Sequence, residues 1–164
     1  MNDREHAIRM DTSFGSEGVT LAAHLARPPG LARAPGLVLC HGFPSGADGA
    51  VTAAATYPEM ADHLSKESGW VVLTFNFRGC GGSQGDFSIE AWLADLSAAV
   101  DHLESVGAAS VWLAGSSLGG SLAVVHGARD PRVRGVATLA APASLEEWAA
   151  NPGRFLAYAR EVGA

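Results

Sequence analysis

One serine, Ser117, lies at the centre of residues 115–119, whose sequence GSSLG matches the pattern G-x-S-x-G. The apolar residues 111–114 before it predict a buried strand, and the small-residue run 119–125 after it predicts a helix. A strand, a sharp turn and a helix with a serine at the apex are typical of a nucleophile elbow, a strained turn that exposes the hydroxyl. This arrangement indicates acyl chemistry through a serine nucleophile.

A second match to the same pattern occurs at residues 81–85, with Ser83 at its centre. This match lies in a loop, between an apolar run that ends at Phe77 and a helix expected to start near Ser88, so no tight strand-to-helix reversal is required there. We therefore interpret Ser83 as a loop serine and Ser117 as the candidate nucleophile.

Two backbone N–H groups are candidates for an oxyanion hole. Residues 41–44 (HGFP) directly follow the apolar run 37–40, and Gly42 allows a substrate to approach this loop closely, so we expect the N–H of Phe43 to be one donor. The N–H of Leu118, at the positive end of the helix after the elbow, is the expected second donor.

These segments resemble, in type and order, those of serine hydrolases of the α/β-hydrolase superfamily. The resemblance runs from about residue 6 to residue 142 and rests on residues 41–44, 76–83 (NFRGCGGS) and 115–119. It is closest to small esterases or serine-aminopeptidase-like members, and it implies a small-molecule acyl substrate, which could be an ester, a thioester or an amide. In such enzymes the R-G-x-G-x-S loop is structural, so Arg78 is not assigned a catalytic role.

The alternation of apolar runs and helical patterns predicts an α/β fold. Strands are expected at 37–40, 70–75, 110–114 and 133–139, and helices near 57–68, 88–104 and 118–128, after a hairpin formed by residues 6–14 and 19–27 around a turn at 15–18. Helices of this length between strands imply a mostly parallel sheet with helices on both faces. We divide the chain into a hydrolase core, residues 1–142, and the helical start of a cap or linker, residues 143–164.

The helix near 88–104 has the clearest pattern. Ser88 is suited to cap its N-terminus, and Trp92, Leu96 and Val100 fall on one apolar stripe, with Asp95 and other acidic residues expected off that stripe.

A complete catalytic triad is not found in the sequence. The resemblance requires an acid and then a histidine after the serine, and the only later histidine, His126, lies nine residues beyond Ser117. That separation corresponds to about 13.5 Å along a helix and half a turn out of phase, so His126 is excluded as the base. Glu146 or Glu147 is conceivable as the acid, although solvated helix charges are the simpler interpretation.

Three explanations are open. The chain could be the N-terminal part of a longer serine hydrolase, truncated before the last strands, the acid and the histidine. Another copy or a complementing chain could supply these parts at the open edge of strand 133–139. Alternatively, the chain is a non-enzymatic scaffold or interaction protein. We expect negligible esterase activity from this chain alone.

Composition excludes several other functions. With 11 basic and 17 acidic residues and a net charge of -6, a nucleic-acid partner is not expected. No apolar stretch is long enough to span a membrane, and we expect a cytoplasmic protein. Cys40 and Cys80 form no metal or disulfide pattern, and no cofactor is expected: Gln84 replaces the third glycine of a dinucleotide fingerprint, and the only lysine, Lys66, follows no glycine-rich run.

Overall fold

The computed structural model describes residues 12–28, 33–43 and 49–144, together with positions 146, 150, 153 and 157; for residues 49–55 it describes the backbone alone. Within these ranges the elements are β1 Thr12–Ser16, β2 Val19–Ala26, β3 Gly36–Cys40, α1 Gly49–Ser68, β4 Val71–Phe75, α2 Ile89–Ser105, β5 Val111–Ser116, α3 Ser117–Gly127 and β6 Val133–Leu139. The strands and helices expected from the apolar patterns are present, and most of their described ends differ by one or two residues. The exception is α1, which begins at Gly49, eight residues before its expected start. The expected helical tail falls mostly outside the described residues.

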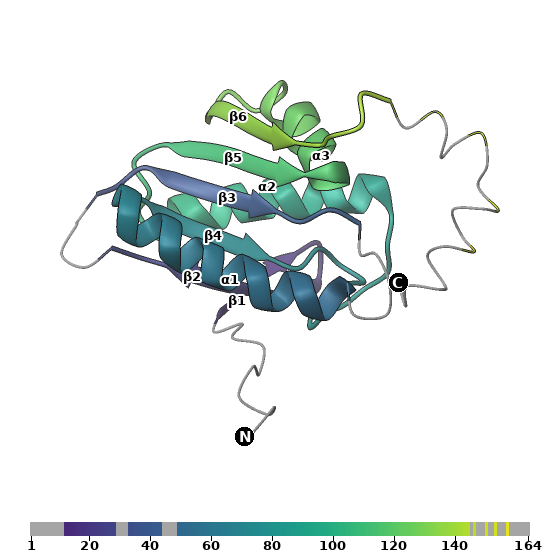
Figure 1. Cartoon of the computed structure of the whole chain (residues 1–164), viewed down its shortest axis with the longest axis horizontal. Helices are drawn as coiled ribbons and strands as arrows, with labels where there is room; N and C mark the ends of the chain where they lie inside the picture. Colours follow the sequence, from purple (N-terminus) through teal and green to yellow (C-terminus); the bar gives the residue numbers. More distant parts are fainter. Residues whose placement is uncertain are drawn as a thin grey trace, which may run out of the picture.

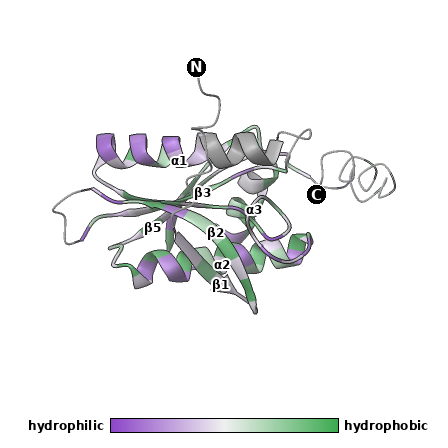
Figure 2. Cartoon of the chain, turned by 90° about the horizontal axis from the view of Figure 1, so that it is seen from below, coloured by the Kyte–Doolittle hydropathy of each residue, from purple (hydrophilic) through white to green (hydrophobic). Residues whose placement is uncertain are grey.

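The strands form one sheet in the order β1-β2-β4-β3-β5-β6 (Figure 1). Strands β4, β3, β5 and β6 are parallel to one another. In contrast, β1 pairs with β2 and β2 pairs with β4 in antiparallel orientation. Figure 2 shows α1 on one side of the sheet and α2 on the other, and α3 contacts α2. The predicted fold class, a mostly parallel sheet with helices on both faces, is therefore confirmed.

The opening hairpin turns more tightly than the sequence suggested. β1 extends to Ser16, so the connection to β2 is the pair Glu17-Gly18, with φ of 44° and 85°. A two-residue turn with positive φ at both positions matches the twist of the flanking strands, and glycine accepts this conformation readily. The expected four-residue turn is thus shortened because Gly15 and Ser16 pair with β2.

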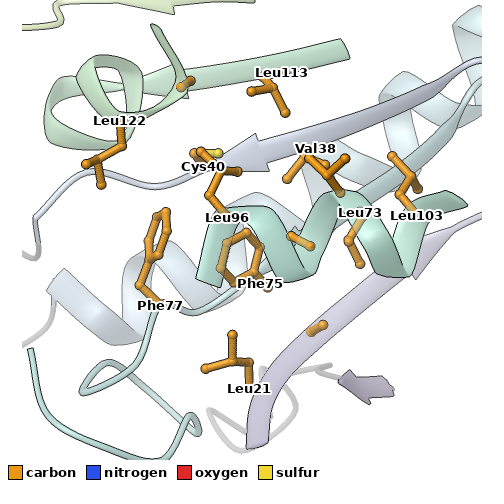
Figure 3. Packing of buried hydrophobic residues seen from close by; sticks show 14 of the residues in the cluster. Leu21, Val38, Cys40, Leu73, Phe75, Phe77, Leu96, Leu103, Leu113 and Leu122 are labelled. Carbon is orange, nitrogen blue, oxygen red and sulfur yellow. The ribbon is translucent and has the colours of Figure 1, made fainter. Parts of the chain in front are cut away.

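The main core lies between the sheet and the pair α2 and α3. In Figure 3, Val38, Leu73, Phe75 and Leu113 of the strands face Leu96 and Leu103 of α2 and Leu122 of α3. The predicted stripe of α2 is buried, and Ser88 caps the helix by accepting a hydrogen bond from the N–H of Ala91 at 3.0 Å. A smaller apolar cluster lies under α1: Ala26, Leu39, Ala61 and Val72.

Asp95 differs from its sequence-based expectation, because it is completely buried rather than solvated. Both of its carboxylate oxygens bind Arg78, which follows β4. A buried carboxylate needs a charged partner, and the helical pattern alone could not reveal one from another element.

β6 lies at one edge of the sheet, and its C-terminal half is exposed, with Leu139 at 73%. The expectation that another chain pairs with this edge stays a prediction. None of the helices in the described ranges combines the length and apolar character needed to cross a membrane.

Candidate functional site

Ser117 lies where β5 passes into α3 without a connecting residue, because β5 ends at Ser116 and α3 begins at Ser117. Its φ is 50°, in the left-handed region that side chains larger than glycine rarely adopt. Such a conformation persists only when the surrounding structure holds it, and it turns the chain sharply enough to leave the side chain half-buried instead of enclosed. This is the backbone geometry expected of a nucleophile elbow.

Two glycines make that turn possible. A Cβ on Gly115 would lie 2.6 Å from the carbonyl carbon and oxygen of Gly119, and a Cβ on Gly119 would collide with the carbonyl oxygen of His41. The first turn of α3 therefore packs directly against the end of β5 and against the loop after β3. The two glycines of G-x-S-x-G are required by close backbone approach on both sides of Ser117.

The loop after β3 lies beside the candidate nucleophile. A Cβ added to Gly42 would come within 2.9 Å of the Cβ of Ser117 and 3.6 Å of its Oγ. Phe43, the next residue, is half-buried, and its ring packs against Phe87 and Trp92 with centroids 5.2 and 6.1 Å away. The loop that carries Phe43 and the helix start that carries Leu118 thus meet at Ser117.

His41 supports this loop. The N–H of Phe77 donates to its Nε2 at 3.1 Å, so the ring proton lies on Nδ1, which donates to the carbonyl oxygen of Gly42 at 2.7 Å. The side chain is 3% exposed, and burial lowers the pKa of the imidazole below its usual value. Both nitrogens of a neutral ring are therefore occupied in holding the backbone, and His41 is not available as a catalytic base.

The other described histidines lie elsewhere. His24 is in β2, which β4 and β3 separate from β5 in the sheet, and its Nε2 lies 2.8 Å from Asp62. His102 stacks on Phe14. His63 is exposed on α1. His6 falls outside the described residues.

His126 is in the last turn of α3, with Nε2 at 3.2 Å from Asp130. This position at the far end of the helix agrees with the sequence-based exclusion of His126 as the base. Of the conceivable acids, Glu146 is exposed, with its backbone N–H bonded to Ser144, and Glu147 falls outside the described residues.

The loop after β4 has a structural role in this molecule. The hydroxyl of Ser83 donates to the carbonyl oxygen of Asn76 at 2.5 Å and accepts from the N–H of Ala22 at 2.9 Å. The guanidinium of Arg78 forms a two-pronged contact with Asp95, through Nε at 3.0 Å and Nη2 at 2.7 Å. These contacts agree with the interpretation of Ser83 as a loop serine and of Arg78 as non-catalytic.

The two cysteines are not alternative nucleophiles, since burial raises the pKa of both the Cys40 and the Cys80 thiol to about 12.

Sequence reasoning missed one side chain at the site, Tyr57 of α1. Its hydroxyl lies 2.7 Å from the Oγ of Ser116, directly before the candidate nucleophile. Its position indicated only the start of the expected helix 57–68, and no local pattern signalled a contact that joins positions 59 residues apart.

Comparison with known proteins identifies the family of the chain. A family model described as alpha/beta hydrolase fold matches residues 35–160. The chain belongs to the alpha/beta hydrolase fold family. No curated protein matches its sequence. Among solved structures, the chain is similar to Est1E from Butyrivibrio proteoclasticus, determined with ferulic acid bound, at 21% identity and a TM-score of 0.65, over 76% of this chain and 50% of that one.

Two further structures of this fold are similar. The esterase Pf2001 from Pyrococcus furiosus is 22% identical, with a TM-score of 0.68 over 86% of this chain and 54% of the esterase. Epoxide Hydrolase A from Mycobacterium thermoresistibile is 26% identical, with a TM-score of 0.62 over 86% of this chain and 43% of that one. The chain spans about half the length of these structures. Together, the family model and these structures establish the fold of the chain.

Proposed function

We propose that this chain carries the nucleophile and the oxyanion hole of a serine hydrolase that acts on a carboxylic ester or a related acyl substrate. The observation that carries the proposal is the left-handed backbone of Ser117 at a direct strand-to-helix junction, with Gly42 packed against its side chain. A strained serine is expected where a hydroxyl must be presented to a substrate rather than packed.

The proposed reaction begins with attack of the Ser117 oxygen on the acyl carbonyl carbon. A general base takes the hydroxyl proton and passes it to the leaving group, and water then releases the acid from the acyl-enzyme. Negative charge develops on the former carbonyl oxygen, where the N–H groups of Phe43 and Leu118 stabilise it. Each such donor contributes about 2.7 to 4 kcal/mol to the transition state.

The general base is not among the described histidines, because their positions and contacts keep them away from Ser117 or occupy both ring nitrogens. We therefore propose that the chain alone has negligible esterase activity and depends on groups from elsewhere, either in the same protein or from a partner. The substrate is proposed at the level of acyl chemistry only, because structures as different as an esterase and an epoxide hydrolase share this fold.

A second candidate is a non-enzymatic scaffold. It is favoured by the fact that His24, His41 and His126 all lie within hydrogen-bonding distance of groups other than Ser117.

A fluorophosphonate probe tests the proposal and separates the two candidates. Without a base Ser117 attacks only slowly, so labelling is expected at excess probe and over a long incubation. We expect one adduct per chain by intact mass, none in Ser117→Ala, and an unchanged adduct in the control Ser83→Ala. A non-enzymatic scaffold predicts no labelling at any concentration, and labelling that survives in Ser117→Ala contradicts the assignment of the nucleophile.

A further inference from the structure

The hydroxyl of Tyr57 contacts the serine before the candidate nucleophile. Tyr57 is half-buried on α1, its oxygen lies 2.7 Å from the Oγ of Ser116, and its ring meets the ring of His41 edge-on at 6.4 Å. The reaction proposed above gives Tyr57 no role, since its hydroxyl reaches Ser116 and not Ser117. The role of this contact follows from what the hydroxyl of Ser116 would bind if Tyr57 were absent.

Ser116 occupies the N-cap of α3. Its backbone is extended, with φ of -109° and ψ of 147°, which is the usual conformation at an N-cap. A serine there ordinarily turns its oxygen to accept the N–H of the second or third helical residue. In this chain the second residue is Leu118 and the third is Gly119. Ser116 makes no such bond, and its hydroxyl lies 2.7 Å from that of Tyr57.

One of the two N–H groups that Ser116 would ordinarily cap, that of Leu118, is thus the proposed oxyanion donor. A donor already bonded to a neighbouring hydroxyl can serve a substrate oxygen only after that bond breaks. A donor without an internal partner is preorganised for the charge that develops in the transition state. Holding Ser116 away from the helix end therefore has a direct chemical consequence.

We propose that Tyr57 is a positioning residue that keeps the N–H of Leu118 available by binding the hydroxyl of Ser116, which would otherwise cap α3 at that N–H. The role of the Leu118 N–H as an oxyanion donor rests on the proposed function. The competition between Tyr57 and Leu118 for the hydroxyl of Ser116 does not depend on that function.

The proposal makes a rescue prediction. In Tyr57→Phe the hydroxyl of Ser116 loses its partner and binds Leu118, so labelling of Ser117 by a fluorophosphonate should slow about 5- to 10-fold, as for one neutral hydrogen bond. The decrease in the labelling rate should come from a slower chemical step and not from weaker binding of the probe. Ser116→Ala removes the competitor, so the double variant Tyr57→Phe/Ser116→Ala should label at close to the wild-type rate.

A matched control is Ser121→Ala on the same helix. Ser121 also donates a hydroxyl hydrogen bond, to the carbonyl oxygen of Pro142 at 2.8 Å, and its removal should leave the labelling rate unchanged. A purely structural role for Tyr57 predicts that the double variant labels no faster than Tyr57→Phe. That result, or a Tyr57→Phe variant that labels at the wild-type rate, overturns the proposal.

The amide proton resonance of Leu118 gives a second readout that needs no reaction. We expect it to move downfield in Tyr57→Phe, as a hydrogen bond forms, and to return in the double variant. If wild type is not labelled at Ser117, the proposed function fails, and this resonance alone then decides the role of Tyr57. An unchanged resonance in Tyr57→Phe contradicts the competition.

Discussion

Ser117 adopts a backbone conformation that costs about 1 to 3 kcal/mol, and several neighbours hold it there. Gly115 and Gly119 let the start of α3 pack on the end of β5, and Gly42 brings the loop after β3 against Ser117. His41 in turn holds this loop through both ring nitrogens. The geometry of one serine therefore depends on a small set of residues that take no part in the chemistry.

Removal of His41 tests this supporting role. His41→Ala loses packing against three aromatic rings and leaves the buried N–H of Phe77 without its acceptor, so the free energy of unfolding should fall by about 2 to 4 kcal/mol. The control His63→Ala removes an exposed histidine and should change it by less than about 0.5 kcal/mol. Urea unfolding measures both, and equal losses in the two variants contradict the role given to His41.

Single residues differed in how far the sequence could predict them. The interpretation of residues 115–119 required only neighbours in the chain, so the strand, the turn and the helix around Ser117 could be predicted. Tyr57 and Asp95 could not, because their partners lie 59 and 17 residues away and on other elements. A buried polar side chain needs a partner, which can lie far away in the sequence, whereas helical spacing predicts only where apolar side chains point.

At the scale of elements, the site exists because β3 and β5 are parallel neighbours. Their C-terminal ends lie at the same edge of the sheet, so the loop after β3 and the elbow after β5 meet, as in other open α/β sheets. Alternation of strands and helices was sufficient to predict parallel strands. The order β4-β3-β5 rests on long-range pairing that no local pattern encodes.

Gly42→Ala tests the contact between these two elements. The added methyl would come within 2.9 Å of Ser117 and 3.2 Å of the carbonyl oxygen of Ser116, so the loop and the elbow must separate. Labelling of Ser117 should slow at least about 10-fold, because small displacements of catalytic groups are costly. Gly15→Ala is the control, since its methyl would meet no atom within 4 Å. Equal labelling rates in the two variants would show that the loop does not contribute to the site.

At the scale of the whole molecule, buried and half-buried histidines make stability depend on pH. Burial lowers the pKa of His41, His102 and His126 below the ordinary value of 6.5. As pH falls through 6.5 the unfolded chain takes up protons that the folded chain does not, so folding should become less favourable. Asp130, whose pKa is lowered to about 2, contributes its stabilisation fully above 3.8 and adds no slope in this range.

We therefore expect a lower urea midpoint at pH 5.5 than at pH 7.5. His102→Gln removes one of the three groups and should narrow the difference between the two midpoints. A midpoint that is equal or higher at pH 5.5 contradicts the burial of these histidines in neutral form.

The whole chain should also be a poor esterase by itself. Loss of the base in a comparable triad lowers kcat by about 10⁶, and no described histidine takes that place. Hydrolysis of a p-nitrophenyl ester by the 164-residue chain should therefore match that of Ser117→Ala. Steady turnover that depends on Ser117 would mean that a base lies within the chain after all.

The most direct test of the proposed nucleophile and oxyanion hole is a crystal structure of the chain after reaction with a fluorophosphonate. The account predicts phosphorus bonded to the Oγ of Ser117, with the phosphonyl oxygen about 2.7 to 3.1 Å from the backbone nitrogens of both Phe43 and Leu118. An adduct on Ser116 or Ser83, or a phosphonyl oxygen that faces solvent and contacts neither nitrogen, would contradict it.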